Sequence, residues 1–222
     1  MYFLTDKVWF PSVAEVFSAS ESQEESLASD GLMAIGGDLS SERLLLAYNS
    51  GIFPWYEEGQ PILWWCPDPR MVLFPEKFKV SKSLQRTILS DKFIVTFNTA
   101  FAEVIKNCAA VYREGQGGTW ITKAMQQSYI NLHQAGHALS VEVWLDDQLV
   151  GGLYGIDLGE KKIFCGESMF ALVSDASKVG FYHLVERLKT QNYKVIDCQI
   201  YTDHLYSLGA EEIPREEFLK LL

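Results

Sequence analysis

The segment HALSVEVWLDDQLVGGLYGIDLGEKKIFCGESMF, residues 137–170, decides the fold because it contains three apolar runs separated by turn signals. The turn signals are Asp146-Asp147 and Gly159-Glu160. Short polar connections of this kind join neighbouring strands, so the segment predicts a three-stranded antiparallel meander.

Two further elements follow the meander. Residues 174–192, SDASKVGFYHLVERLKTQN, place Phe181, Leu184 and Leu188 on one face of an expected helix. Residues 194–200, KVIDCQI, form a short apolar run that is typical of a buried strand. The helix and this strand are expected to complete the core around the meander.

Upstream of the meander, the sequence predicts four helices and two strands. Asp38 or Ser40 is the expected N-cap of the first helix, and Gly51 is its expected end. Ser81 or Ser83 is expected near the start of the second, basic helix. In chain order, the elements are a helix within 38–51, a strand within 71–75, a helix within 79–92, a strand within 93–98, and helices within 99–110 and 123–136.

The domain organisation follows from an aromatic, proline-bounded junction, FPWY at 53–56 and ILWWCPDPR at 62–70. We predict a small N-terminal domain over 1–62, in which the polar stretch 18–31 is a surface loop, and a second domain over 63–222. The fold class is α/β (α+β). The order of helices, meander, helix and strand in the second domain favours an acetyltransferase-like (GNAT-type) domain with a mostly antiparallel central sheet.

The composition excludes several classes of protein. Of the 222 residues, 48% are hydrophobic and 22% are charged, which excludes a disordered acidic tail. The four cysteines form no CxxC pair, so a disulfide-dense scaffold is excluded. No apolar run approaches the roughly 18 residues of a membrane span, and the N-terminal segment carries an acid and a proline too early for a secretory signal. We expect a soluble cytoplasmic monomer without a membrane partner.

The charge is unevenly distributed along the chain. The net charge is −10 overall, and residues 1–60 hold ten acids and two bases, a net charge of −8. Residues 70–123 hold nine bases and four acids, a net charge of +5. A basic segment in an acidic protein is typical of a phosphate-binding face, and the alternative is a solvated helix face.

The candidate catalytic groups are polar residues in apolar strands. Glu167 lies in the third meander strand, and Asp197 and Gln199 are two apart in the last strand, hence expected on one face. A buried carboxylate is costly unless it is paired, so these groups indicate a polar site, or alternatively a structural hydrogen-bond network. Loop tryptophans at 55, 64, 65 and 120 are candidates for stacking on a base, and the alternative is packing at the domain junction, which we favour for Trp64 and Trp65.

Familiar cofactor motifs are missing from the sequence. His133 and His137 are four residues apart, but Gly136 lies between them and no HExxH glutamate is present, so no metal site is expected. There is no GxSxG motif, P-loop or dinucleotide fingerprint. The sequence therefore predicts an activity without a metal or another cofactor.

The motifs, taken in order, resemble the leucyl/phenylalanyl-tRNA–protein transferase family from about residue 32 to 216. They are GGDLSSERLLLAYNSGIFPWY, ILWWCPDPR, GTWIT, HALSVEVW, LVGGLYG, FCGESMF, ASK, IDCQ and DHLYSLGAEEIPR. The resemblance implies transfer of leucine, phenylalanine and, less often, methionine from aminoacyl-tRNA to an N-terminal arginine or lysine of a protein. That transfer marks the protein for degradation by the N-end rule pathway.

The resemblance also implies roles for individual residues. Asp197 and Gln199 match a pair that acts on the attacking amine, and Glu167 matches a glutamate that helps hold the substrates. Trp55 and Trp120 match tryptophans at the site of the tRNA 3′ adenosine. The residues that match the amino-acid side-chain pocket are Leu153, Phe164, Phe181, Leu184, Leu188 and Ile196. Within the basic segment, the residues expected to contact the tRNA backbone are Lys79, Lys82 and Arg86.

Simple chemistry agrees with this reading. The donor ester is already activated, and an α-amine with a pKa of about 7.7–8.0 is partly neutral near pH 7, so positioning can supply most of the acceleration. An amide is barely basic, so Gln199 is expected to orient the amine while Asp197 polarises the pair. The rivals are an acyl-CoA N-acetyltransferase, whose glycine-rich pyrophosphate loop is absent from SDASKVGF, and a non-catalytic module that binds RNA or protein N-termini.

Overall fold

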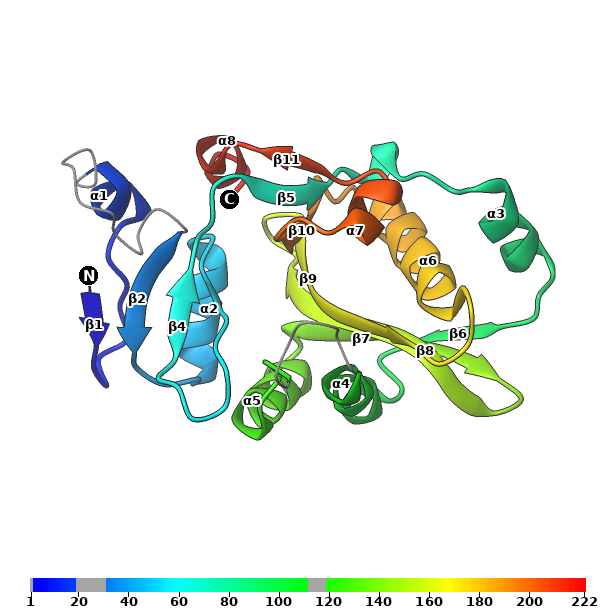
Figure 1. Cartoon of the computed structure of the whole chain (residues 1–222), viewed down its shortest axis with the longest axis horizontal. Coiled ribbons are helices and arrows are strands. Elements are labelled where there is room, and N and C mark those ends of the chain that lie inside the picture. The colour runs from blue at the N-terminus through cyan, green and yellow to red at the C-terminus, as the bar shows by residue number, and fades with distance from the viewer. Residues whose placement is uncertain (1, 19–30, 112–118) are drawn as a thin grey trace.

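The structure, a computed structural model, describes residues 2–18, 31–111 and 119–222. Its strands form two sheets, a four-stranded sheet near the N-terminus and a seven-stranded sheet that fills most of the molecule (Figure 1). The stretch 18–31, expected as a surface loop, falls largely outside the described residues, and so does Gly118, the first residue of the GTWIT motif.

The small sheet has the order β1-β2-β4-β3, with β1 parallel to β2 and the other pairs antiparallel. Its elements, with the two helices beside it, are β1 Tyr2–Leu4, α1 Val13–Ser18, β2 Leu32–Gly36, α2 Ser41–Asn49, β3 Phe53–Pro54 and β4 Leu63–Trp65. Ser40 caps α2, and Gly51 follows the helix with a φ of +77°. The predicted start and end of this helix are therefore confirmed.

The aromatic junction is more regular than the sequence suggests. Its two parts contain β3 and β4, which are two and three residues long, too short to show a strand period. The division of the chain at residue 62 stays a prediction. Because β4 pairs with β2 and β3 in the small sheet, we propose a boundary a few residues later, between Trp65 and Arg70.

The large sheet has the order β11-β5-β10-β9-β8-β7-β6. Its strands are β5 Arg70–Leu73, β6 Ile94–Phe97, β7 Ala138–Leu145, β8 Gln148–Leu158, β9 Ile163–Ala171, β10 Val195–Gln199 and β11 Glu211–Ile213. All neighbours are antiparallel except β9 and β10, so the predicted meander and mostly antiparallel sheet are confirmed. Asp146 and Asp147 both have positive φ, as a two-residue hairpin turn of type I′ requires.

Helices cover both faces of the large sheet (Figure 1). The helix α6 packs on one face, and α4 and α5 pack on the other. The helices, with one short 3-10 turn, are η3 Pro75–Lys77, α3 Lys82–Leu89, α4 Phe101–Ala110, α5 Lys123–Gln134, α6 Ala176–Thr190, α7 Asp203–Ser207 and α8 Arg215–Leu219. The element order predicted for an acetyltransferase-like domain is thus confirmed.

The two faces of the large sheet belong to different apolar cores. On the α6 face, Phe164, Phe181 and Leu184 lie in one cluster. On the other face, the cluster runs from Tyr129 of α5 to Tyr48 of α2, so the small sheet and the large sheet share a core. Within the described ranges, no helix is long and apolar enough to cross a membrane.

Candidate functional site

The end of β10 departs from regular strand geometry. Asp197 is paired with Val72 of β5, Gln199 is paired with Met71, and the register shifts between the two pairs. Gln199 has a φ of +59°, a left-handed conformation that is unfavourable for a residue with a long side chain. A bulge therefore interrupts the regular strand pairing between Asp197 and Gln199, while Ile196 and Cys198 belong to the cluster under α6.

Asp197 is held by a buried arginine. Nε of Arg70 donates to Oδ1 of Asp197 at 2.8 Å, and a terminal guanidinium nitrogen donates to Oδ2 at 2.7 Å. Both side chains are 1% exposed. The guanidinium lies over the rings of Phe53 and Phe218, 4.9 and 4.6 Å from their centroids, so the small sheet and α8 both enclose it. Burial opposes the charge of Arg70, but the adjacent Asp197 carboxylate raises the pKa of Arg70 overall, so the guanidinium stays protonated.

The ion pair with Arg70 limits how Asp197 can interact with Gln199. Oδ1 of Asp197 also accepts a hydrogen bond from the main-chain N–H of Gln199 at 3.1 Å. The contact with Gln199 thus goes to its backbone, and the carboxylate is otherwise occupied by Arg70. The geometry supports an anchoring role for Asp197, in which it fixes the strained backbone of Gln199, rather than polarisation of the amide.

Glu167 lies beside Gln199 on the neighbouring strand β9. It is partly buried, and its Oε2 accepts a hydrogen bond from the hydroxyl of Tyr129 at 3.1 Å. That hydroxyl is in turn hydrogen-bonded to the hydroxyl of Tyr48. Burial raises the pKa of Glu167 to about 8, although the Tyr48 and Tyr129 hydroxyls act in the opposite direction. The structure therefore brings together the three predicted catalytic residues, Glu167, Asp197 and Gln199.

The six residues predicted to line the amino-acid pocket also lie together. All belong to the apolar cluster between the sheet and α6, and none is more than 3% exposed. A ligand side chain can therefore meet this cluster at its rim or after a rearrangement of the packed side chains. The partly buried residues packed against the cluster include Phe78, Phe97, Met169 and Leu205, which the sequence did not single out.

The four loop tryptophans differ in their surroundings. Trp64 is fully buried, and its indole N–H donates to the carbonyl of Gly36 at 2.8 Å. The indole N–H of Trp65 donates to the carbonyl of Trp55 at 2.7 Å, and the two rings meet edge to face. The predicted packing role of Trp64 and Trp65 is confirmed. Trp55 is 37% exposed and Trp120 is partly exposed, so both keep surface for a ligand.

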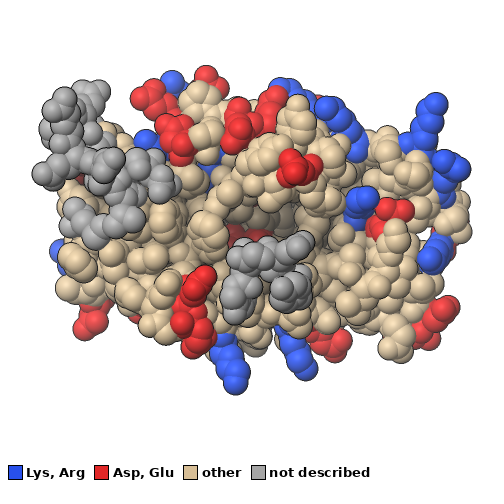
Figure 2. All heavy atoms as spheres, in the orientation of Figure 1, with Lys and Arg blue, Asp and Glu red and all other residues tan. Residues whose placement is uncertain are grey.

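The basic segment presents part of its charge at one end of the molecule. Lys79, Lys82 and Arg86 are exposed on or just before α3. Figure 2 shows Lys and Arg side chains gathered at the end where α3 lies in Figure 1. Arg70 does not contribute to this face, because it is buried and paired with Asp197. Lys77 is paired with Glu211, so the usable positive charge is smaller than the sequence total.

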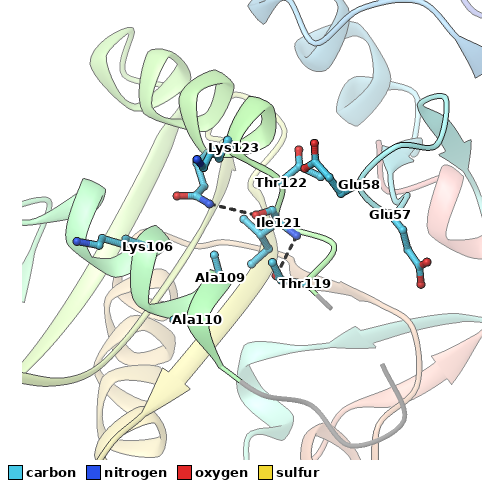
Figure 3. Close-up of a pocket in the computed structure, with 10 residues that line it drawn as sticks. Glu57, Glu58, Lys106, Ala109, Ala110, Thr119, Ile121, Thr122 and Lys123 are labelled. Carbon is cyan, nitrogen blue, oxygen red and sulfur yellow. Dashed lines mark hydrogen bonds between the residues drawn. The ribbon is translucent and has the colours of Figure 1, made fainter. Parts of the chain in front are cut away.

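A cavity of about 510 Å³ lies between the loop after β3 and the helices α4 and α5 (Figure 3). Glu57 and Glu58 line it from the small domain, and Lys106 and Lys123 line it from the helices. None of the predicted catalytic residues is among its lining residues. Its wall includes Thr119 and Ile121, the chain neighbours of Trp120, which places it beside the predicted adenosine contact and apart from Gln199.

The described residues include no group of three or more His, Cys, Asp or Glu side chains placed to hold a metal ion. Nδ1 of His133 lies 2.8 Å from the carbonyl of Ala138, and its ring stacks on Phe101, while His137 is exposed. All four cysteines are buried and none is in a disulfide.

Four residues of structural or functional weight were not identified as such from the sequence. Arg70 was counted only as a surface base, and Tyr48 and Tyr129 look like ordinary apolar positions of two helices. Glu142 meets the criterion that selected Glu167, a carboxylate within an apolar strand. It is fully buried and accepts hydrogen bonds from Thr96, Thr99, Ala100 and Ser140, so its role is structural.

Comparisons with known proteins point to the same family along the length of the chain. The family described as "Leucyl/phenylalanyl-tRNA protein transferase" matches residues 72–222, and the N-terminal domain of the same family matches residues 37–68. A leucyl/phenylalanyl-tRNA–protein transferase of Christiangramia forsetii is 57% identical over 222 residues, which cover 100% of both chains. One of Flavobacterium psychrophilum is 56% identical over 222 residues, 100% of this chain and 99% of the relative.

A solved structure, a GCN5-related N-acetyltransferase from Kribbella flavida, aligns with a TM-score of 0.35 and 10% identity. The alignment covers 76% of this chain and 59% of that one. The sheet order and the helices on both faces of the sheet establish the fold class by themselves.

Proposed function

The chain belongs to the leucyl/phenylalanyl-tRNA–protein transferase family, and from this premise we propose that it transfers leucine, phenylalanine and, less often, methionine from aminoacyl-tRNA to proteins. The acceptors are proteins with an N-terminal arginine or lysine, which the transfer marks for N-end rule degradation. The observation that carries the proposal is the full-length identity to named transferases, together with the convergence of Glu167, Asp197 and Gln199.

The chemistry asks little of the enzyme beyond positioning. The aminoacyl ester is an activated donor, and the α-amine of the acceptor attacks its carbonyl carbon, the tRNA ribose leaving as the alcohol. The nucleophile must be neutral, and an α-amine with a pKa of about 7.7–8.0 provides a sufficient neutral fraction near pH 7. Gln199 orients the amine, and Arg70 and Asp197 hold the backbone of Gln199 in place.

The substrates carry opposite charges, and so do the surfaces proposed for them. Lys79, Lys82 and Arg86 are exposed and suited to the tRNA backbone. The acceptor is cationic, and Figure 2 shows a hollow near the middle of the molecular face with acidic side-chain atoms at its floor. Leucine, phenylalanine and methionine would meet the rim of the apolar cluster under α6, where Met169 is partly buried.

The direct test is transfer of radiolabelled phenylalanine from charged tRNA to a peptide with N-terminal arginine. An otherwise identical peptide with N-terminal alanine is the control for the acceptor, and valyl-tRNA is the control for the donor. The proposal expects transfer that requires both the arginine and the phenylalanyl or leucyl donor. Folded protein that transfers nothing, or transfers equally to both peptides, would contradict it.

A further inference from the structure

The side-chain amide of Gln199 has two orientations, and they differ in what faces Glu167. In one orientation, Nε2 donates to Oε1 of Glu167 at 3.4 Å, and the amide oxygen faces the carbonyls of Gly166 and Cys198. In the other, Nε2 donates to both of these carbonyls at 3.0 Å. The second orientation satisfies the amide better, because oxygen no longer faces oxygen there.

The second orientation sets a condition on Glu167. It turns the amide oxygen of Gln199 toward Oε1 of Glu167, into the position 3.4 Å away that Nε2 holds in the first orientation. An ionised carboxylate would repel an oxygen there, whereas a protonated one would attract it. An amide oxygen does not carry a proton at neutral pH, so this orientation favours a proton on Glu167. The hydroxyl of Tyr129 already donates to Oε2, which leaves Oε1 as the oxygen that holds the proton.

Burial favours the protonated form of Glu167 and outweighs the hydroxyls of Tyr48 and Tyr129, which favour the ionised form. From β10, the Asp197 carboxylate raises the pKa of Glu167, and from β5, Arg70 lowers it while being paired with Asp197. From α2 and α5, Tyr48 and Tyr129 present hydroxyls whose own pKa values burial raises well above 10, so they stay neutral donors. Burial is the largest influence, and it raises the pKa of Glu167 to about 8. The raised pKa therefore favours the protonated form near pH 7.

We propose that Glu167 works as a neutral carboxylic acid that donates from Oε1 to the amide oxygen of Gln199, with Tyr129 and Tyr48 as the residues that position it. The donation keeps the amide in the orientation in which Gly166 and Cys198 hold Nε2. The amide oxygen retains a second lone pair, which accepts an N–H of the acceptor amine. This inference rests on the proposed transfer function and adds a role for the proton on Glu167.

The pH dependence of kcat/KM follows from two ionisations, that of the acceptor α-amine and that of Glu167. Raising the pH toward 8 increases the neutral fraction of the α-amine, so kcat/KM rises. Above pH 8, Glu167 loses its proton, the amide turns toward the carboxylate, and kcat/KM falls. Glu167→Gln carries an N–H in place of the O–H and cannot ionise, so its kcat/KM rises with pH and then stays level. At pH 7, Glu167→Gln is expected to exceed Glu167→Ala at least tenfold.

The role of Tyr129 and Tyr48 is tested by the pH at which kcat/KM falls in variants of each. The Tyr129 hydroxyl stabilises the ionised form of Glu167, so Tyr129→Phe raises the pKa of Glu167 and moves the fall in kcat/KM to higher pH. Tyr48→Phe shifts it in the same direction. A merely structural role would lower kcat/KM by one factor at every pH. Tyr2→Phe and Glu216→Gln, both on the surface, are the matched controls and leave the profile in place.

An infrared titration tests the same point without any transfer activity. At pH 7, the wild type should show the carbonyl band of a protonated carboxylic acid, which Glu167→Gln lacks and Glu216→Gln keeps. The band should disappear between pH 7 and 9. Absence of the band at pH 7, or a Glu167→Gln variant as inactive as Glu167→Ala, would overturn the inference. A protein with the band but no transfer would keep the protonation and contradict the proposed function instead.

Discussion

Two carboxylates of the large sheet, Glu142 and Glu167, look alike in the sequence and differ in the structure. Each lies in an apolar strand of the meander. Glu142 accepts five hydrogen bonds from Thr96, Thr99, Ala100 and Ser140. Two of them come from the main-chain N–H groups of Thr99 and Ala100, just before α4. Glu167 has the Tyr129 hydroxyl on one oxygen and the Gln199 amide beside the other. A carboxylate saturated with donors stabilises the fold, whereas one with few donors and a raised pKa is available for chemistry.

Asp197 extends the comparison, because it is saturated like Glu142 and yet lies in the site. Its two oxygens are taken up by Arg70 and by the main chain of Gln199. We therefore expect changes at Asp197 to affect stability and activity together.

The largest expected effect is that of Asp197→Ala. It leaves the Arg70 guanidinium buried without its partner, so the free energy of unfolding should fall by about 3–5 kcal/mol. Transfer should fall at least 100-fold, because the backbone of Gln199 loses its anchor. Glu211→Ala removes an exposed ion pair with Lys77 and serves as the control, with an expected loss of about 1 kcal/mol or less. Urea unfolding measures the loss of stability in both variants. Equal losses for Asp197→Ala and Glu211→Ala would show that the Arg70–Asp197 pair does not hold the site.

Substitutions at Gln199 should separate activity from stability. Gln199→Gly and Gln199→Ala both remove the amide, so both should lose transfer by about 100-fold. Glycine tolerates the φ of +59° and alanine does not, so the glycine variant should be more stable than the alanine variant by about 1 kcal/mol. If the alanine variant were equally stable, the left-handed backbone at Gln199 would not be a source of strain.

A smaller effect is expected at the basic end of the molecule. Lys82→Ala combined with Arg86→Ala should raise KM for the aminoacyl-tRNA about three- to tenfold and leave KM for the peptide unchanged. The slope of log KM against log salt should also decrease, by about one for each lost phosphate contact. Lys220→Ala, an exposed base on the C-terminal segment, is the control. An unchanged KM for the tRNA would remove α3 from the proposed interface.

The sequence predicted the elements with clear periodicity or caps and missed the short ones. Ser40 and Ser81, each one of two expected start residues, are the caps observed, and the paired aspartates marked the meander turn, because these are local signals. The strands β3 and β4 are too short for a pattern. For the site, polarity within apolar strands identified Glu167, Asp197 and Gln199. The same criterion could not separate Glu167 from Glu142, because hydrogen-bond donors from distant segments decide between them.

The most direct test of this account measures unfolding free energy and kcat for two variants side by side, Glu142→Ala and Glu167→Ala. Removing the Glu142 carboxylate leaves several buried donors unpaired, so we predict a loss of at least about 3 kcal/mol with kcat of the folded protein within about twofold of wild type. Removing the Glu167 carboxylate should lower the unfolding free energy by about 1 kcal/mol or less and lower kcat at least tenfold. Two variants that lose stability and rate in the same proportion would contradict the distinction between a structural and a functional carboxylate.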